Sequence, residues 1–584
     1  MMHDIRYRIG APWQDLSGES DHPDDIEYIR TNIPCQWACP AQTNIPGYIE
    51  QIYRRNFNRS YGINRRSNLF PGVLGRICSR PCELACRHGE TDLGEPVSIC
   101  YLKRFAADQK TPDHVITEDM FPATGRSIGV IGAGPAGLAV AHSLAVFGHR
   151  VTIYEQMAEP GGMLRYGIPS FRLPRDVIDR EIYNIVRLGI AIEFGCALGK
   201  DIRIPDLLQR HDAVVLAAGC FSPRSLAIPG ENLPGVLSGL DFMIRVNQGE
   251  TPAIGDRVIV LGGGFTAMDC ARTARRLGSK DIVICIRNVE EDLTVTREEI
   301  LDVKREGIRF VSLVSSMSIQ GDTHATGVRF ARNRFGGVRG RSGRTVIPIE
   351  GSEFDLAADT IIAAIGQGPD TRLTGAPDSD LRFDPLTGRS NIEGLYGAGD
   401  FARGASTVIE SIGHGRQVAT SVDGDLMKRI RRKKVVSFQP STDTHRQRAW
   451  DFIPRTHMPS LDLPDRFASQ DAEVELGFDP DLGLSESQRC YLCNLKYEIH
   501  IPDCIYCRLC VEACPRNCIE LGLSPAQPPR PGTWTKTSRW NEVAGIVIDS
   551  DRCIRCGECL RVCPTQCIHV TRVELQDRLL SSEG

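Results

Sequence analysis

The placement of the 22 cysteines constrains this 584-residue chain more than any other feature of its sequence. Six lie in residues 1–100, four between 101 and 480, and twelve after residue 480. In a reducing compartment, closely spaced cysteines indicate ligands of metal ions or clusters rather than disulfides. The four central cysteines are isolated and are expected to be small, buried side chains: Cys196, Cys220, Cys270 and Cys285.

The last 95 residues contain the same cysteine run twice, C-x2-C-x2-C-x3-C followed by proline. In bacterial ferredoxins the first three thiolates of such a run bind one [4Fe–4S] cluster and the fourth binds the other. The spacing therefore predicts two crossed ligand sets: Cys504, Cys507, Cys510 and Cys563 for one cluster, and Cys553, Cys556, Cys559 and Cys514 for the other. Zinc is the alternative for any single CxxC pair. Cys518 and Cys567 are expected to be non-ligands.

The N-terminal cysteines can supply a third cluster through Cys39, Cys78, Cys82 and Cys86. Four further cysteines then remain near the two ends of the chain: Cys35, Cys100, Cys490 and Cys493. One hypothesis is that these four hold a fourth cluster between the N- and C-terminal modules. The alternative is that they are unligated, or that one ligand of such a cluster is not a cysteine.

Two glycine fingerprints predict two dinucleotide sites. The first comprises Gly132, Gly134, Pro135, Ala136 and Gly137, between an expected strand at 127–131 and a helix beginning near residue 135. Its glycines allow a tight turn and let a pyrophosphate approach the helix N-terminus. Glu155 ends the next strand, where an acid is expected to bind ribose hydroxyls. The second follows an expected strand at 257–261 and comprises Gly262, Gly263, Gly264, Thr266 and Ala267.

These motifs predict a multidomain α/β protein with two nested Rossmann-like domains. Gly399 and Asp400, far downstream, are expected to close the FAD site, so that the nicotinamide domain is inserted within the FAD domain. Further strands are expected at 150–154, 213–217, 281–286 and 360–365. We expect a helical Fe–S domain at 1–120, an FAD-binding domain formed by 121–230 and 371–430, and an NAD(P)-binding domain at 231–370. A linker at 431–489 is expected to lead to an α+β ferredoxin-like domain with two clusters at 490–584.

The composition and the charge pattern indicate where the protein is located and which kinds of partner it binds. A net charge of −4 argues against nucleic acid as the main partner. The apolar stretch from Ile128 to Gly148 is interrupted by glycines, so a buried strand–turn–helix is expected there rather than a membrane span. The N-terminus is polar and charged, which favours the cytoplasm. The basic run at 431–434 is expected to be a solvated face, or alternatively a docking site for an acidic redox partner.

Residues 30–430 resemble the small (beta) subunit of NADPH-dependent glutamate synthase and its relatives. These relatives include the larger subunit of electron-bifurcating ferredoxin:NADP transhydrogenases and the N-terminal half of dihydropyrimidine dehydrogenase. The matching segments are residues 35–40, 75–86, 161–169, 262–269, 397–400 and 407–410. The resemblance implies FAD, NADPH and N-terminal [4Fe–4S] clusters. It also adds candidate cofactor-binding residues within the matching segments: Gly162, Arg165, Thr407 and Val408.

Three departures from the family pattern affect these expectations. The family usually has a CxxC upstream of the position of Cys35, and this chain lacks it. A glutamine ligand of dihydropyrimidine dehydrogenase corresponds to Lys103, which is a poor ligand. The Tyr-Arg-Arg that meets the NADPH 2′-phosphate reads Ile286-Arg287-Asn288 here. One guanidinium at Arg287 still favours NADPH over NADH.

The cofactor set indicates an oxidoreductase. A nicotinamide transfers hydride, iron–sulfur clusters transfer single electrons, and a flavin can do both. The favoured function is an NAD(P)H:ferredoxin-type oxidoreductase that serves as a subunit of a hetero-oligomeric redox complex. Its partner would be ferredoxin or a catalytic redox subunit, for example a 2-oxoacid:ferredoxin oxidoreductase. The alternatives are a glutamate synthase small subunit and a non-enzymatic electron relay. No acid–base residue is required or assigned.

Overall fold

The computed structural model describes residues 18–90, 94–112, 114, 116–340, 343–374, 381–442, 446–522, 543 and 545–580. The polar N-terminus considered above for targeting lies outside these residues. The chain divides into two units. Unit 1 comprises Met1–Thr117, Met427–Met458 and Gly477–Gly584, and unit 2 comprises Glu118–Leu426 and Pro459–Leu476. Both cysteine-rich ends therefore belong to unit 1, and both glycine fingerprints belong to unit 2.

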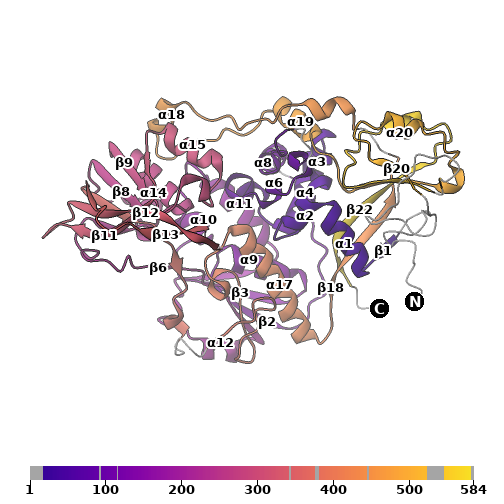
Figure 1. Cartoon of the computed structure of the whole chain (residues 1–584). Helices are drawn as coiled ribbons and strands as arrows, with labels where there is room; N and C mark the ends of the chain where they lie inside the picture. The colour runs from indigo at the N-terminus through magenta and orange to yellow at the C-terminus, as the bar shows by residue number, and fades with distance from the viewer. Residues whose placement is uncertain are drawn as a thin grey trace. The chain divides into compact units, whose positions relative to one another are not determined.

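The N-terminal part of unit 1 is built from short helices (Figure 1). Their bounds are α1 Pro23–Asn32, α2 Pro34–Ala38, α3 Ile45–Tyr53, α4 Phe57–Asn68, α5 Pro71–Ile77, α6 Pro81–Leu84, α7 Arg87–Glu90 and α8 Ile99–Gln109. Prolines start several of them, because proline at the first helical position lacks only an N–H that would have no partner. The cysteines lie at or next to these helix ends.

The remaining segments of unit 1, at 427–458 and 477–584, are called the ferredoxin part below. Two sheets are formed mainly by these segments. The larger has the order β1-β18-β22-β19, with bounds Gly18–Ser20, Arg432–Pro440, Ile568–Leu579 and Leu495–Ile499. The smaller pairs β20 (Ile519–Gly522) with β21 (Gly545–Ile548). The helices here are η4 Arg448–Phe452, α19 Pro480–Gln488, η5 Ile501–Asp503, α20 Leu509–Ala513 and α21 Glu558–Val562.

The described residues of the expected linker at 431–489 include one strand and three helical segments. Its basic run begins β18, which pairs along its length with β22. Val435, Val436 and Phe438 of this strand are buried, and Lys433 pairs with Asp21. The sequence did not reveal this strand because its partner lies more than a hundred residues away. Its apolar content is also small.

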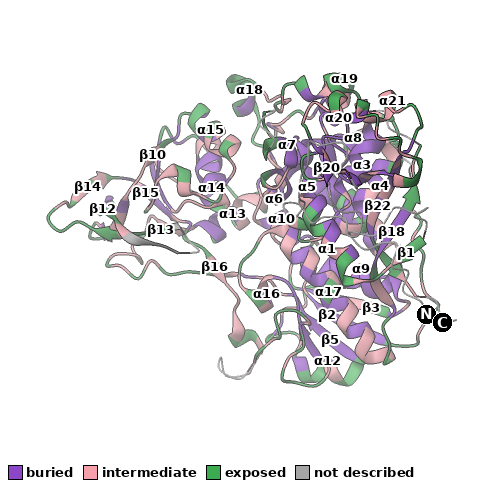
Figure 2. Cartoon of the chain, turned by 45° about the vertical axis from the view of Figure 1, so that its right-hand side comes forward, coloured by how far each residue is buried: buried purple, intermediate pink, exposed green. Residues whose placement is uncertain are grey.

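The first sheet of unit 2 is parallel, in the order β17-β5-β2-β3-β4. The bounds are Leu395–Gly397, Ala213–Leu216, Ser127–Ile131, Arg150–Glu155 and Ala191–Phe194. Its helices are α9 Pro135–Val146, α10 Met163–Tyr166, α11 Arg175–Val186, α12 Ile204–Arg210, α16 Asp400–Arg403 and α17 Val408–Met427. β2 and nearly all of α9 are buried, so the apolar stretch forms a strand–turn–helix (Figure 2).

The second sheet is also parallel, in the order β10-β9-β8-β15-β7. The bounds are Arg309–Val311, Asp281–Cys285, Arg257–Leu261, Thr360–Ala363 and Val236–Ser238. Its helices are α13 Gly239–Asn247, α14 Phe265–Arg276, α15 Arg297–Arg305 and the short η2 Glu290–Asp292. All five strands lie between β5 and β17 in the sequence. The chain thus leaves the first sheet, builds the second and returns to the first.

An antiparallel sheet that the sequence analysis did not anticipate follows β10. It contains β11 Val314–Gln320, β12 Gly327–Gly340, β13 Gly343–Pro348 and β14 Phe354–Ala357. A two-stranded ladder pairs β6 (Ser222–Pro223) with β16 (Gln367–Gly368), which η3 (Thr371–Thr374) follows. Of the four central cysteines, Cys220, Cys270 and Cys285 are buried as expected, whereas Cys196 is partly exposed because it follows the edge strand β4.

A buried ionic network lies on α14 and α15. The Glu306 carboxylate, just after α15, accepts hydrogen bonds from Arg272 and Arg276 of α14. Arg466 of α18 (Leu463–Ala468), in the segment 459–476, also pairs with Glu306. Arg172 pairs with Asp269 of α14 at 2.7 Å. The Glu306 side chain is completely buried.

None of the helices in the described part of the chain combines the length and the apolar composition that a bilayer span requires.

Candidate cofactor and cluster sites

The first glycine turn has the geometry of a dinucleotide site. The Gly132 N–H bonds the Tyr154 carbonyl, and Gly132 has φ of +103°, which glycine adopts without strain. A Cβ on Gly137 would stand 1.9 Å from the Gly132 carbonyl oxygen, so only glycine lets α9 approach the turn. The Glu155 carboxylate accepts N–H bonds from Ala133 and Met157 at 2.7 and 2.8 Å. Burial raises the pKa of Glu155, and these bonds oppose the shift.

The segment that begins at Gly399 contacts the first glycine turn directly. A Cβ on Gly399 would lie 2.4 Å from the Ala136 Cβ, in the first turn of α9. Asp400 accepts hydrogen bonds from the Ser406 and Ser411 hydroxyls at 2.5 and 2.8 Å. Burial raises the pKa of Asp400, while these hydroxyls lower it. Thr407 bonds Glu410 and precedes Val408, the first residue of α17.

The segment 159–165, which includes the start of α10, also contacts this turn. The Gly161 N–H bonds the Ala133 carbonyl, and a Cβ on Gly162 would lie 2.9 Å from the Gly134 Cα. Arg165 is buried, donates to the Pro160 carbonyl and pairs with Asp179. Arg165 therefore ties the segment 159–165 to α11, which carries Asp179.

The second glycine turn repeats the arrangement. The Gly262 N–H bonds the Cys285 carbonyl, and a Cβ on Gly262 would lie 2.2 Å from the Ala364 carbonyl oxygen. Gly264, which caps α14, has no protein atom near its missing Cβ. That open face at a helix N-terminus suits a pyrophosphate. Thr266 is exposed, Ala267 is buried, and Arg287 is exposed just beyond β9. The residues present therefore fit two dinucleotides.

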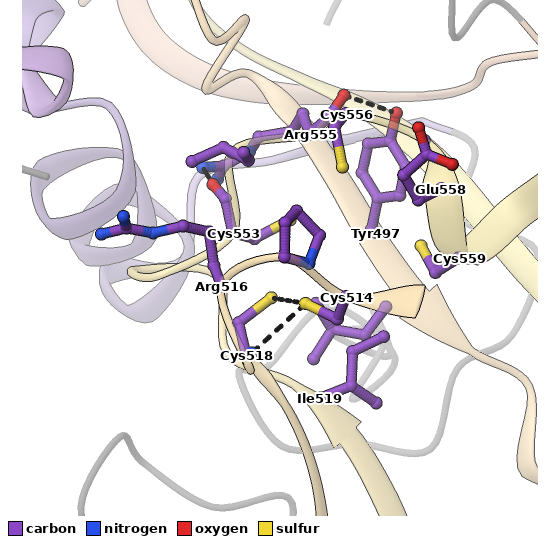
Figure 3. Close-up of a pocket in the computed structure, with 14 residues that line it drawn as sticks. Tyr497, Cys514, Arg516, Cys518, Ile519, Cys553, Arg555, Cys556, Glu558 and Cys559 are labelled. Atoms are coloured by element: carbon purple, nitrogen blue, oxygen red, sulfur yellow. Dashed lines mark hydrogen bonds between the residues drawn. The ribbon is translucent and has the colours of Figure 1, made fainter. Parts of the chain in front are cut away.

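Two cavities of the ferredoxin part are lined by the crossed cysteine sets. One is lined by Cys504, Cys507, Cys510 and Cys563, together with Cys567. The other is lined by Cys514, Cys553, Cys556 and Cys559, together with Cys518 (Figure 3). The Cys518 backbone N–H donates to the Cys514 sulfur at 3.3 Å, and the two sulfurs are also 3.3 Å apart. Cys518 and Cys567 thus lie beside a candidate ligand in each cavity.

The N-terminal cysteines are grouped differently from the sequence expectation. A third cavity is lined by Cys35, Cys86, Cys490 and Cys493. Cys100 lies elsewhere, with its Sγ 3.3 Å from the Leu74 carbonyl. The N-terminal cysteines that do not line this cavity are all buried: Cys39, Cys78, Cys82 and Cys100. The structure therefore exchanges Cys86 and Cys100 between the two expected sets.

The helix geometry explains this exchange. Cys82 lies within α6, the one-turn helix Pro81–Leu84, and Cys86 follows it; only Cys86 lines the third cavity. Cys100 is in the first turn of α8, and the Tyr48 hydroxyl bonds the preceding Ile99 carbonyl. The spacing of the cysteines in the sequence does not predict which cavity each side chain lines. Among the residues that the structure describes, no three His, Cys, Asp or Glu side chains are arranged to share one metal ion.

Comparison with known proteins places the chain in a family. Residues 126–417 match the family model described as pyridine nucleotide-disulphide oxidoreductase. The chain belongs to this family. Residues 30–115 match dihydropyrimidine dehydrogenase domain II, a 4Fe-4S cluster domain, and residues 503–567 match a 4Fe-4S dicluster domain. These matches support an FAD/NADP-binding fold flanked by cluster domains.

Three curated relatives have similar sequence identity to this chain. The beta subunit of NADP(+)-dependent formate dehydrogenase from Moorella thermoacetica is 32% identical, over 79% of this chain and 70% of that protein. The glutamate synthase [NADPH] small chain of Azospirillum brasilense is 33% identical, over 66% and 85%. The beta subunit of the NADPH-Fe(3+) oxidoreductase of Geobacter sulfurreducens is 32% identical, over 79% and 75%. The resemblance stated from the sequence is confirmed, and the chain is an FAD- and Fe–S-dependent NAD(P)H oxidoreductase.

Proposed function

We propose that the chain is the electron-transfer subunit of a larger redox complex, carrying electrons between NADPH and a one-electron acceptor protein. The observation that carries this proposal is the presence of two crossed-cysteine cavities in a chain that also has two dinucleotide turns. A bound flavin supplies the exchange between hydride and single electrons. Each of the relatives above has a name that marks it as a subunit or chain.

Specific residues would hold each group. The first turn, Glu155, Gly162 and the segment 399–408 would bind FAD, with Asp400 at the ribitol. The second turn, Thr266 and Arg287 would bind the nicotinamide dinucleotide. The two ferredoxin cavities would each hold a [4Fe–4S] cluster through their crossed sets. A third cluster would use the four buried N-terminal cysteines that do not line the Cys35 cavity: Cys39, Cys78, Cys82 and Cys100.

The test is spectroscopic. Anaerobic NADPH should bleach the flavin absorbance of the purified protein and then reduce a viologen dye. NADH should act more weakly. Absence of bleaching with either nucleotide would contradict the proposal.

The partner is suggested by two kinds of relative. The formate dehydrogenase and Fe(3+) oxidoreductase subunits favour a redox partner reached through clusters. The glutamate synthase small chains favour the second candidate, a glutamate synthase small subunit, which glutamate formation with a large subunit would establish. The dicluster domain at 503–567 favours the first. The 2-oxoacid:ferredoxin oxidoreductase considered from the sequence has no counterpart among these relatives.

Replacing Arg287 should shift the nucleotide preference. Arg287 is exposed at the end of β9, where its guanidinium can pair with a 2′-phosphate. Loss of one charge-assisted hydrogen-bonded pair costs about 1.5–3 kcal/mol. Arg287→Ala should therefore raise the KM for NADPH by about 10- to 100-fold. The KM for NADH and the kcat should change little. Steady-state viologen reduction measures this.

The control is Arg309→Ala, which removes an exposed arginine of the neighbouring strand that pairs with Asp281. It should leave both KM values unchanged. Equal weakening of NADPH and NADH binding by Arg287→Ala would show that the side chain does not read the 2′-phosphate.

The exit for electrons would be the cavity of Cys504, Cys507, Cys510 and Cys563. Cys507 is exposed, and the neighbouring Ile505 and Leu509 expose 63% and 44% of their surface. Cys553 and Cys556 of the other cavity are buried. Ile505→Asp should therefore slow reduction of an acceptor protein such as ferredoxin by about tenfold, the cost of one disrupted apolar contact. Viologen, which needs no docking surface, should be reduced at the normal rate.

A charge placed on an exposed apolar residue of unit 2 is the matched control. Leu386→Asp alters a side chain that is 64% exposed and should leave both rates unchanged. If Ile505→Asp and Leu386→Asp slow ferredoxin reduction equally, the exit does not lie at Cys507.

A further inference from the structure

The third cavity is lined by Cys35, Cys86, Cys490 and Cys493. Two of these cysteines, Cys490 and Cys493, lie outside both matched cluster domains. Residues 490–493 fall between the matches at 30–115 and 503–567. The rest of the cavity lining consists of six apolar residues, Pro34, Ile45, Pro46, Ile49, Val97 and Ile99, together with Arg87, His88 and Tyr491. Cys35 and Cys493 expose only 8% and 7% of their surface. The described cysteines are all free thiols.

These four thiols face one another. All four line one cavity, and no carboxylate of the described residues lines it with them. Buried thiols that converge in this way have little value as isolated polar groups. They match the ligand set of a cubane cluster.

The backbone of the Cys490-x-x-Cys493 loop resembles that of the two ferredoxin loops. Its third residue, Leu492, has φ of +52°. The third residues of Cys504-x-x-Cys507 and Cys553-x-x-Cys556 are Tyr506 and Arg555, and both have φ of +53°. A left-handed conformation is costly for side chains of this size, so its recurrence in three CxxC loops indicates a common local purpose.

Two buried arginines hold this loop in place. The Arg489 side chain donates to the carbonyls of Ile453, Pro96 and Glu95. The Arg446 Nε donates to the Cys490 carbonyl at 3.1 Å, and the guanidinium lies 4.7 Å from the Tyr491 ring. Both arginine side chains are 1% exposed. A loop fixed by so many buried hydrogen bonds presents its thiols in a constant geometry.

We propose that Cys35, Cys86, Cys490 and Cys493 bind a fourth [4Fe–4S] cluster, which ties the loop at 490–493 to the N-terminal helices. The two cysteines of this loop replace the CxxC that the chain lacks upstream of Cys35.

The position of the cavity gives the cluster a role in the proposed function. Arg446 also donates to the Ile554 carbonyl at 3.0 Å, and Ile554 lines the cavity of Cys553 and Cys556. Cys35 and Cys86 come from the N-terminal cysteines, whereas Cys490 and Cys493 precede the ferredoxin loops in the sequence. The fourth cluster would therefore add a one-electron carrier that joins the two cysteine-rich segments of unit 1.

The test is the metal content of the full-length holoprotein, purified without oxygen. Four clusters require about 16 iron and 16 sulfide per FAD, and three require about 12 of each. The wild type should give the higher value, without zinc. A count near 12, or zinc in place of iron, would overturn the proposal. This measurement does not depend on the folding of any variant.

The double variant Cys490→Ala, Cys493→Ala locates the cluster. It should lose about four iron and four sulfide per FAD, whereas Cys196→Ala should lose none. NADPH should still bleach the flavin of both variants, so loss of the cluster is distinguished from failure of the proposed function. An unchanged iron content in the double variant would overturn the proposal.

Discussion

Replacing Gly137 with alanine should remove FAD from the protein and abolish NADPH-driven viologen reduction. The new Cβ would stand 1.9 Å from the Gly132 carbonyl oxygen, so the turn and α9 must separate. Forcing such a shift in a packed strand–turn–helix costs about 3 kcal/mol or more. FAD affinity should fall by at least about 100-fold. Flavin absorbance after gel filtration and fluorescence titration with FAD measure the loss.

The control is another helical glycine. Gly62, in α4, has no atom within 4 Å of its missing Cβ. Gly62→Ala should keep FAD and change stability by no more than about 1 kcal/mol. Normal FAD content in Gly137→Ala would show that the close approach of α9 to the turn is not required for binding.

Replacing Glu306 with glutamine should give the largest loss of stability in unit 2. Its carboxylate is completely buried and pairs with Arg272, Arg276 and Arg466. The glutamine keeps the shape and leaves those guanidinium groups without their shared anion. Removing one partner of a buried ionic group costs about 3–5 kcal/mol. The temperature at which FAD is released should fall by about 5–10 °C.

The pH dependence follows from the same carboxylate. Burial alone would raise the pKa of Glu306 from its ordinary 4.5, but Arg272 and Arg276 lower it to about 2. The stabilisation is therefore complete above about pH 4.5 and is lost as the pH falls towards 2. The stability gap between wild type and Glu306→Gln should be constant near pH 7 and should shrink below pH 4.5.

An exposed glutamate serves as the control. Glu291, in η2, is exposed, and Glu291→Gln should change the release temperature by less than about 1 °C. If Glu306→Gln behaves like Glu291→Gln at pH 7, the network contributes no stability.

The sequence predicted the elements whose signals are local. The strands at 127–131 and 257–261 have the predicted bounds, because buried parallel strands read as short apolar runs before a glycine turn. The ferredoxin spacing fixes which thiols converge, since each loop is only a few residues long. The structure lines two cavities with these same sets.

Features that depend on distant partners could not be read in this way. β18 is a strand because β22 pairs with it, and the antiparallel sheet of β11 to β14 forms by pairing among strands that bury only part of their residues, such as Val328 and Phe330 of β12. Whether Cys86 or Cys100 joins Cys35 in the third cavity depends on how α6 and α8 are packed. The spacing of the cysteines in the sequence does not show this. The Glu306 network joins α14, α15 and the segment 459–476, which no local pattern connects.

The central claim is that electrons from NADPH reach the clusters only by way of FAD. It is tested most directly by mixing NADPH anaerobically with the holoprotein and with protein freed of FAD, and recording cluster reduction by low-temperature EPR. The account predicts reduced clusters in the holoprotein. In the FAD-free protein it predicts none with NADPH, although dithionite should still reduce them. Equal cluster reduction by NADPH with and without FAD would contradict the account.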